Sequence, residues 1–148
     1  MFRYFSNSTF LILSLLAISC TKQQTRRNPY LQEVRFSVSV NLSLPSYNNL
    51  TSIGNPVYIN EAGVGTKGVF VMNVGFDQFR AFEASCSNHI PNSCSLLQVT
   101  GQSGICDCDE LNYSLFTGQL LNRPSEGVYY DLLEYNTQLS GDVLRIYN

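Results

Sequence analysis

Four cysteines and one histidine are the residues of this chain whose types and spacing could do chemistry. Cys86, Cys94, Cys106 and Cys108 lie within 23 positions, and His89 is the single histidine among 148 residues. Thiolates and imidazoles bind metals, whereas thiols in an oxidising compartment pair as disulfides. Two disulfides among four cysteines allow three connectivities, and the residues alone leave all three open.

An acidic group accompanies the last two of these cysteines. Asp107, Asp109 and Glu110 stand between and beyond Cys106 and Cys108. We expect a solvated loop tip here and not a cation site. One histidine does not support a Ser-His-Asp arrangement, and no glycine-rich phosphate loop follows a strand. We therefore expect no catalytic residues and a protein that is not an enzyme.

Residues 1–19 predict an export signal, and Cys20 is the predicted site of lipid attachment. Arg3 precedes the apolar run 10–18, which is much shorter than the roughly 20 residues of a membrane-spanning helix. Small residues lead into Cys20 as they do in bacterial lipoprotein signals. We expect cleavage before Cys20 and acylation of that residue. Several acyl chains would anchor the protein durably in a membrane of the bacterial envelope, facing the periplasm.

The rest of the chain predicts a tether followed by one domain. Residues 20–33 form the lipidated cysteine and a polar, flexible tether, and residues 34–148 form the domain. Without residues 1–19 the chain has eight Lys and Arg against eleven Asp and Glu. This acidic balance excludes a nucleic-acid partner, because basic surface supplies that affinity. The expected partners are the membrane, through the lipid, and an unknown envelope protein.

Short apolar runs between turn residues predict an all-β domain. Apolar and polar residues alternate strictly over 34–44, which is the pattern of a half-buried strand. No window shows a convincing helical period. Further strands are expected at 57–59, 69–74, 78–83, 96–100, 128–135 and 143–147. Many short strands at this spacing are typical of a sandwich or barrel.

The segments around the cysteines resemble the Rieske family of iron–sulfur domains. Residues 79–86 match a strand that ends in Phe-x-Ala-x-Cys, residues 105–109 match a loop that begins Cys-x-Cys-His, and residues 113–121 match an aromatic residue with a Thr-Gly-x-x-Leu turn. Pro124 falls where the family has a proline-containing third loop. The resemblance spans about residues 54–147. It implies a Rieske-like antiparallel β-sandwich with a small ligand-loop subdomain.

The resemblance also places the ligand positions of the family on this chain. A Rieske centre has two thiolate and two imidazole ligands, in the pattern Cys-x-His and Cys-x-x-His. Cys86 and Cys106 match the thiolates, whereas Asn88 and Asp109 occupy the two histidine positions. The chain thus resembles a degenerate, Bacteroidetes-like lipoprotein type that lacks both histidine ligands. We expect no cofactor, and we expect His89, one position past a ligand site, to be a surface residue without a role.

A disulfide pairing follows from the same resemblance. In respiratory Rieske proteins a disulfide joins the two ligand loops, and Cys108 stands in the place of its second cysteine, with Cys94 as the candidate partner. Without a cluster, Cys86 and Cys106 would face one another. The resemblance therefore implies the pairs Cys94–Cys108 and Cys86–Cys106.

The favoured function is a non-enzymatic structural or interaction part of an envelope assembly. One alternative is electron transfer by a 2Fe-2S cluster with unusual ligation by Cys86, His89, Cys106 and Asp109. The same four residues could instead bind zinc, which accepts sulfur, nitrogen and oxygen donors. Another alternative is thiol–disulfide exchange at an exposed Cys86–Cys106 pair, which the acidic neighbours would oppose by raising the thiol pKa.

Overall fold

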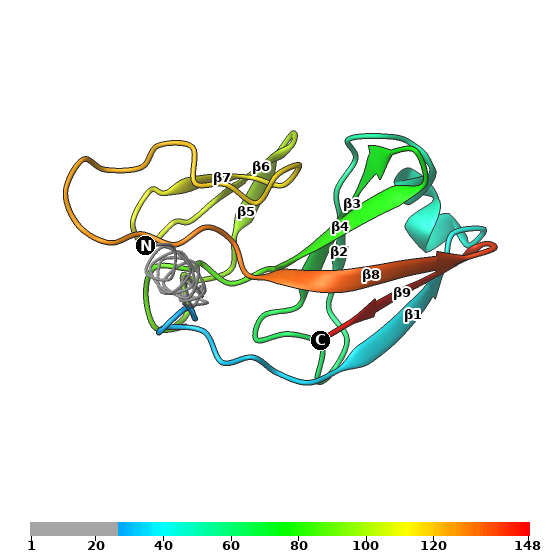
Figure 1. The fold of residues 1–148 in the computed structure, drawn as a ribbon, viewed down its shortest axis with the longest axis horizontal. Coiled ribbons are helices and arrows are strands. Elements are labelled where there is room, and N and C mark those ends of the chain that lie inside the picture. Colours follow the sequence, from blue (N-terminus) through cyan, green and yellow to red (C-terminus); the bar gives the residue numbers. More distant parts are fainter. Residues whose placement is uncertain (1–26) are drawn as a thin grey trace, which may run out of the picture.

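The computed structural model describes residues 27–148, which form two antiparallel sheets side by side (Figure 1). The larger sheet has six strands in the order β1-β9-β8-β4-β3-β2, and the smaller has the order β5-β6-β7. The predicted signal, Cys20 and the start of the predicted tether lie outside the described residues. No helix within residues 27–148 is long and apolar enough to cross a membrane.

The elements follow one another along the chain, and the two longest connections are residues 84–97 between β4 and β5 and residues 115–133 between β7 and β8. The larger sheet consists of β1 (Ser37–Asn41), β2 (Val57–Ile59), β3 (Val69–Gly75), β4 (Gln78–Glu83), β8 (Glu134–Ser140) and β9 (Val143–Tyr147). The smaller sheet consists of β5 (Gln98–Thr100), β6 (Ser103–Ile105) and β7 (Asn112–Ser114). A 3-10 helix, η2 (Pro45–Thr51), follows β1.

The six-stranded sheet has two halves, β2-β3-β4 and β8-β9-β1, and it curls where β8 passes from pairing with β4 to pairing with β9. The first residues of β8, Glu134 and Tyr135, pair with Phe82 and Ala81 of β4, and residues 136–140 pair with β9. The halves enclose a first core, to which each fully buried apolar side chain contributes about 1.5–3 kcal/mol. Its buried aliphatic members are Val38, Val40, Leu50, Ile59, Val64, Val69, Val71, Ala81, Leu144 and Ile146.

A second core connects the larger sheet to the three-stranded sheet. β3 and β4 contribute to both cores, since their successive side chains point to opposite faces that are both covered. Residues 69–72 therefore form an uninterrupted apolar run even though the sheet is antiparallel. The second core contains Phe70, Met72, Phe82, Ala84, Cys86, Leu97, Cys106, Leu111, Tyr113, Leu115, Leu120 and Leu132.

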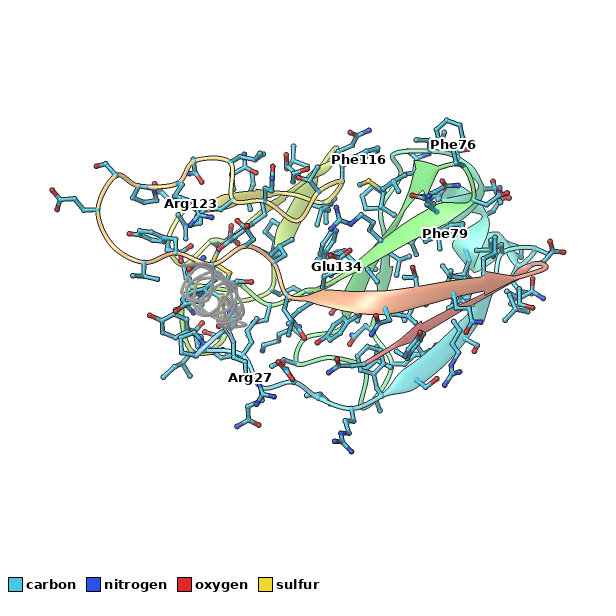
Figure 2. The ribbon with its side chains drawn as sticks, in the orientation of Figure 1. Arg27, Phe76, Phe79, Phe116, Arg123 and Glu134 are labelled. Atoms are coloured by element: carbon cyan, nitrogen blue, oxygen red, sulfur yellow. A yellow bond between two sulfur atoms is a disulfide. The ribbon has the colours of Figure 1, made fainter. Side chains whose placement is uncertain are left out.

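In the turn after β7, the backbone of Gly118 lies against the aromatic ring of Phe82. Gly118 has a φ of +77°, and a Cβ at this position would lie 2.6 Å from Cε1 of Phe82. Glycine is the residue that adopts this conformation without a steric penalty. Gly118 thus seats the turn on Phe82 of β4, and Figure 2 shows the neighbouring Phe116 beside the small sheet.

The all-β class is confirmed, but three predicted strands begin at later residues than expected. The predicted strand 96–100 is strand only over 98–100. The run 34–44 is a strand only over 37–41, because the Asn41 side chain accepts a hydrogen bond from Ser43 N and Pro45 then begins η2. The run 128–135 becomes strand only at Glu134. β6 and β7 were not predicted, since their sequences, Ser-Gly-Ile and Asn-Tyr-Ser, contain no apolar run.

Candidate functional site

Three loops meet beside the second core. The first loop (84–97) connects β4 to β5, the second (106–111) connects β6 to β7, and the third (121–133) leads to β8. Backbone hydrogen bonds close the first two: Cys86 N donates to Ser95 O at 2.7 Å, and Cys106 N donates to Leu111 O at 2.9 Å. These bonds hold both cysteines at fixed positions.

Two disulfides join the first loop to the second. Cys86 pairs with Cys106, with their Cα atoms 5.7 Å apart, and Cys94 pairs with Cys108 at 5.5 Å. These are the pairs that the resemblance implies. Cys86 and Cys106 are both 0% exposed, so the hypothesis of an exposed redox pair there is wrong. A thiolate cannot reach a buried disulfide without opening the loops.

Asn88, which the resemblance aligns with the first histidine ligand, belongs to a hydrogen-bond network. Its Nδ2 donates to Tyr113 Oη at 2.7 Å and to Tyr130 O at 2.9 Å, while its Oδ1 accepts from Tyr130 N at 2.8 Å. The side chain thus connects the first loop to the third loop and to the buried phenol of Tyr113.

This network predicts a measurable cost for truncating Asn88. Asn88→Ala removes three hydrogen bonds and should lower the free energy of unfolding by about 2–3 kcal/mol. Amide hydrogen exchange at Tyr130 should become faster in the same variant. Asn136→Ala, at an exposed side chain of β8, is the control and should stay within about 0.5 kcal/mol of wild type. Equal stability of the two variants would contradict this role.

Asp109, which the resemblance aligns with the second histidine ligand, does not belong to the group of possible ligand atoms around the disulfides. It is exposed, and its Oδ1 accepts a 3.3 Å hydrogen bond from Leu111 N within the second loop. The ligand atoms that lie within 4.8 Å of one another belong to Cys86, His89, Cys106 and Cys108. The alternative ligand set with Asp109 therefore differs from the group that forms, in which Cys108 takes its place.

His89 is half-buried and faces the buried disulfide, contrary to its expected place on the surface. Its Nε2 lies 3.2 Å from Cys106 Sγ, and its Nδ1 lies 3.0 Å from the carbonyl oxygen of Ile90. The shift by one residue relative to the family pattern does not remove the imidazole from the site. The conformation of residues 87–90 decides this, and no sequence pattern reports it.

These donors do not fit a Rieske centre. That centre needs two imidazoles, and the chain has one histidine in total. Both polar atoms of the Asn88 amide are engaged by protein partners, and its Nδ2 is a hydrogen-bond donor without a free electron pair. A cluster with the ligands of the family therefore has no second nitrogen donor here.

The third loop is held by polar contacts beside Pro124. Arg123 donates to Tyr129 O at 2.6 Å and to Asp131 Oδ1 at 2.7 Å, and Figure 2 shows Arg123 on this loop. Asn122 Nδ2 donates to Glu110 O at 2.9 Å. These contacts close the loop on itself and join it to the second loop.

The start of the described chain also contacts the site. Asn28 Nδ2 donates to Ser87 O at 2.7 Å, and Asn28 Oδ1 accepts from the backbone nitrogens of Tyr30 and Leu31. Leu31 is buried, and the Tyr30 and Tyr130 rings pack edge to face. The contacts of the domain therefore begin before Val34, where the sequence places its start.

Two buried tyrosines predict a loss of stability at alkaline pH. Burial raises the pKa of Tyr113 to about 12, and burial together with the charge of Glu83 raises the pKa of Tyr135 above its usual range. A raised pKa in the folded state gives stability that is present below pH 10 and lost as pH rises toward 12. Each tyrosine contributes up to about 1.4 kcal/mol per pH unit.

Urea denaturation at pH 8 and pH 11 measures this effect. The free energy of unfolding should be lower at pH 11, and the decrease should be smaller in Tyr113→Phe, which has no phenol to ionise at that position. An identical decrease in wild type and variant would contradict the assignment to Tyr113.

The comparisons with known proteins bear on the fold. No protein-family model and no curated protein matches the sequence. Among solved structures, the cyanobacterial plasma membrane Rieske protein PetC3 from Synechocystis PCC 6803 is similar, with a TM-score of 0.52 and 21% identity over 75% of this chain and 99% of that chain. A chain of the complex of reduced oxygenase and oxidized ferredoxin in carbazole 1,9a-dioxygenase has a TM-score of 0.47 and 19% identity, over 78% of this chain and 94% of its own.

The likeness to PetC3 extends over 99% of that chain, and at 21% identity it is a likeness of fold. The described residues have a Rieske-like, almost all-β fold.

Proposed function

We propose that this chain is a lipid-anchored envelope protein whose Rieske-like domain carries no iron–sulfur cluster and serves as a non-enzymatic structural or interaction module. The observation that carries the proposal is the network of Asn88. A metal ligand must direct a free electron pair at the metal, whereas both polar atoms of the Asn88 amide form hydrogen bonds with Tyr113 and Tyr130. The Cys86–Cys106 disulfide supports the same conclusion, since it occupies both thiolate ligands.

The cofactor part of the proposal is tested by iron content. Untreated wild-type protein, purified from a host able to assemble clusters, should be colourless and contain no stoichiometric iron. Two iron atoms per chain, with the absorption and electron paramagnetic resonance of a two-iron centre, would overturn the proposal. That result would make electron transfer the preferred function.

The location part of the proposal rests on Cys20 and the signal before it. The residues before Cys20 resemble the end of a bacterial lipoprotein signal. The similar PetC3 is described as a plasma membrane protein. A domain anchored by lipid needs no spanning helix, which agrees with the absence of one among residues 27–148.

Replacing Cys20 should release the protein from the membrane. In Cys20→Ala the site of acylation is gone, so most of the protein should move from the membrane fraction to the soluble fraction after cell disruption. Cys94→Ala changes a cysteine of the domain and should leave the protein in the membrane fraction. Tight membrane binding of Cys20→Ala would mean that the lipid anchor is absent or dispensable.

A further inference from the structure

The imidazole of His89 is oriented as a metal ligand. A carbonyl oxygen only accepts hydrogen bonds, so the 3.0 Å contact with Ile90 O places the ring proton on Nδ1. Nε2 then carries a free electron pair, and it faces Cys106 Sγ at 3.2 Å. A disulfide sulfur has no proton to donate to it. Metal-binding histidines show the same arrangement, with one ring nitrogen bonded to a carbonyl and the other on the metal.

Three sulfur atoms lie near this nitrogen, and two of them, those of Cys86 and Cys106, are joined by a disulfide in the oxidised chain. Sγ of Cys86, Cys106 and Cys108 and a ring nitrogen of His89 all lie within 4.8 Å of one another. A tetrahedral zinc ion holds its donors about 2.0–2.3 Å from itself, which places them roughly 3.3–3.8 Å apart. Three cysteines and one histidine are a standard donor set for structural zinc. Reduction removes the sulfur–sulfur bond, so the sulfur atoms of Cys86 and Cys106 can separate to the spacing that a tetrahedral ion needs.

We propose that reduction of the two disulfides converts this group into a zinc site with Cys86, His89, Cys106 and Cys108 as ligands. A dithiol reductant gives two electrons and two protons to each disulfide and itself becomes a disulfide, which leaves four thiols on the chain. Zn²⁺ then displaces one proton from each of the three ligand thiols, and His89 Nε2 binds without releasing a proton. Three protons leave, the site has a net charge of −1, and Cys94 remains a thiol.

The loop structure favours this exchange of one crosslink for another. Cys94 is exposed, so its bond to Cys108 is the first that a reductant reaches, and this frees Cys108. Loss of that bond also lets the first and second loops move apart, which opens the way for the reductant to the buried Cys86–Cys106 bond. Cys86 and Cys106 are held by backbone hydrogen bonds to Ser95 and Leu111 that do not depend on the sulfur–sulfur bond. Zinc would then join the first loop to the second, as the disulfides do in the oxidised chain.

Metal titration of the full-length protein tests the site. The protein is reduced with a dithiol, freed of reductant and metal without air, and titrated with Co²⁺ and then Zn²⁺. One Co²⁺ per chain should bind with the visible absorption of a tetrahedral ion and with thiolate-to-cobalt charge transfer, and Zn²⁺ should displace it. The oxidised protein should bind neither ion. Should the reduced chain unfold, one equivalent of Zn²⁺ should refold it, as followed by circular dichroism.

Four variants test the ligand assignment. His89→Ala and Cys108→Ser each remove a ligand and should weaken zinc binding by at least about tenfold. Cys94→Ser and Asp109→Asn change neighbours outside the group and should bind as the wild type does. The proposal is overturned if the reduced wild type neither binds nor folds with zinc, if His89→Ala binds unchanged, or if Cys94→Ser loses binding as Cys108→Ser does. None of these results alters the iron content of the untreated protein, which tests the proposed function separately.

Discussion

Glu83→Gln is expected to lower the free energy of unfolding by about 3–5 kcal/mol, because it changes a fully buried carboxylate with four hydrogen bonds. Oε1 accepts from the backbone nitrogens of Lys67 and Ser85, and Oε2 accepts from Thr66 N and Tyr135 Oη, at 2.6–3.0 Å. The amide nitrogen of glutamine is itself a donor, so one pair of these donors would lose its acceptor inside the core. Thermal denaturation should show a Tm lower by roughly 10–20 °C.

Glu134→Gln is the matched control for this prediction. Glu134 also pairs at short distance, with Arg80 Nη2 at 2.7 Å, but both side chains are partly exposed to water. Exposed ion pairs contribute about 0–1 kcal/mol, so this variant should be almost as stable as the wild type. A loss for Glu83→Gln no larger than that for Glu134→Gln would show that the buried network contributes little.

Removal of the buried disulfide is the second large effect. The double variant Cys86→Ala, Cys106→Ala opens a loop with a sequence separation of 20 and should cost about 3 kcal/mol, chiefly by enlarging the freedom of the unfolded chain. Loss of the two sulfur atoms also leaves space in the second core, to which both residues belong. Urea denaturation of the oxidised proteins measures the difference.

The double variant Cys94→Ala, Cys108→Ala is the comparison. Its loop has a sequence separation of 14, so the entropic cost is similar, but Cys94 is exposed and Cys108 only partly buried, so less packing is lost. The Cys86, Cys106 variant should therefore be the less stable of the two. The reverse order would indicate that the buried bridge is strained or unformed in solution.

Strands are predicted correctly from the sequence where a short apolar run is flanked by turn residues on both sides. Residues 57–59, 78–83 and 143–147 are strands with the expected bounds, because turn residues flank each apolar run. The strand predicted at 128–135 is wrong over 128–133, because these residues form a loop. Within this loop Leu132 is buried in the second core, whereas Val128 is exposed. Apolar content alone does not distinguish a strand from a loop that covers a core.

The site is predictable only as far as the resemblance reaches. It implies the pairs Cys86–Cys106 and Cys94–Cys108, which the structure also forms. It does not predict the contact of His89 with Cys106, which depends on the conformation of residues 87–90. The burial of Glu83 is equally hidden, because its partner Tyr135 lies 52 residues away in the sequence.

Peptide mapping without reduction tests the central claim most directly, namely that Cys86 and Cys106 bind each other in the place where the family holds iron. Wild-type protein purified without reductant and digested under non-reducing conditions should yield a peptide pair joined through Cys86 and Cys106, a second pair joined through Cys94 and Cys108, and no free thiol from the domain. Recovery of Cys86 and Cys106 as free thiols, or bound to other cysteines, would contradict the account.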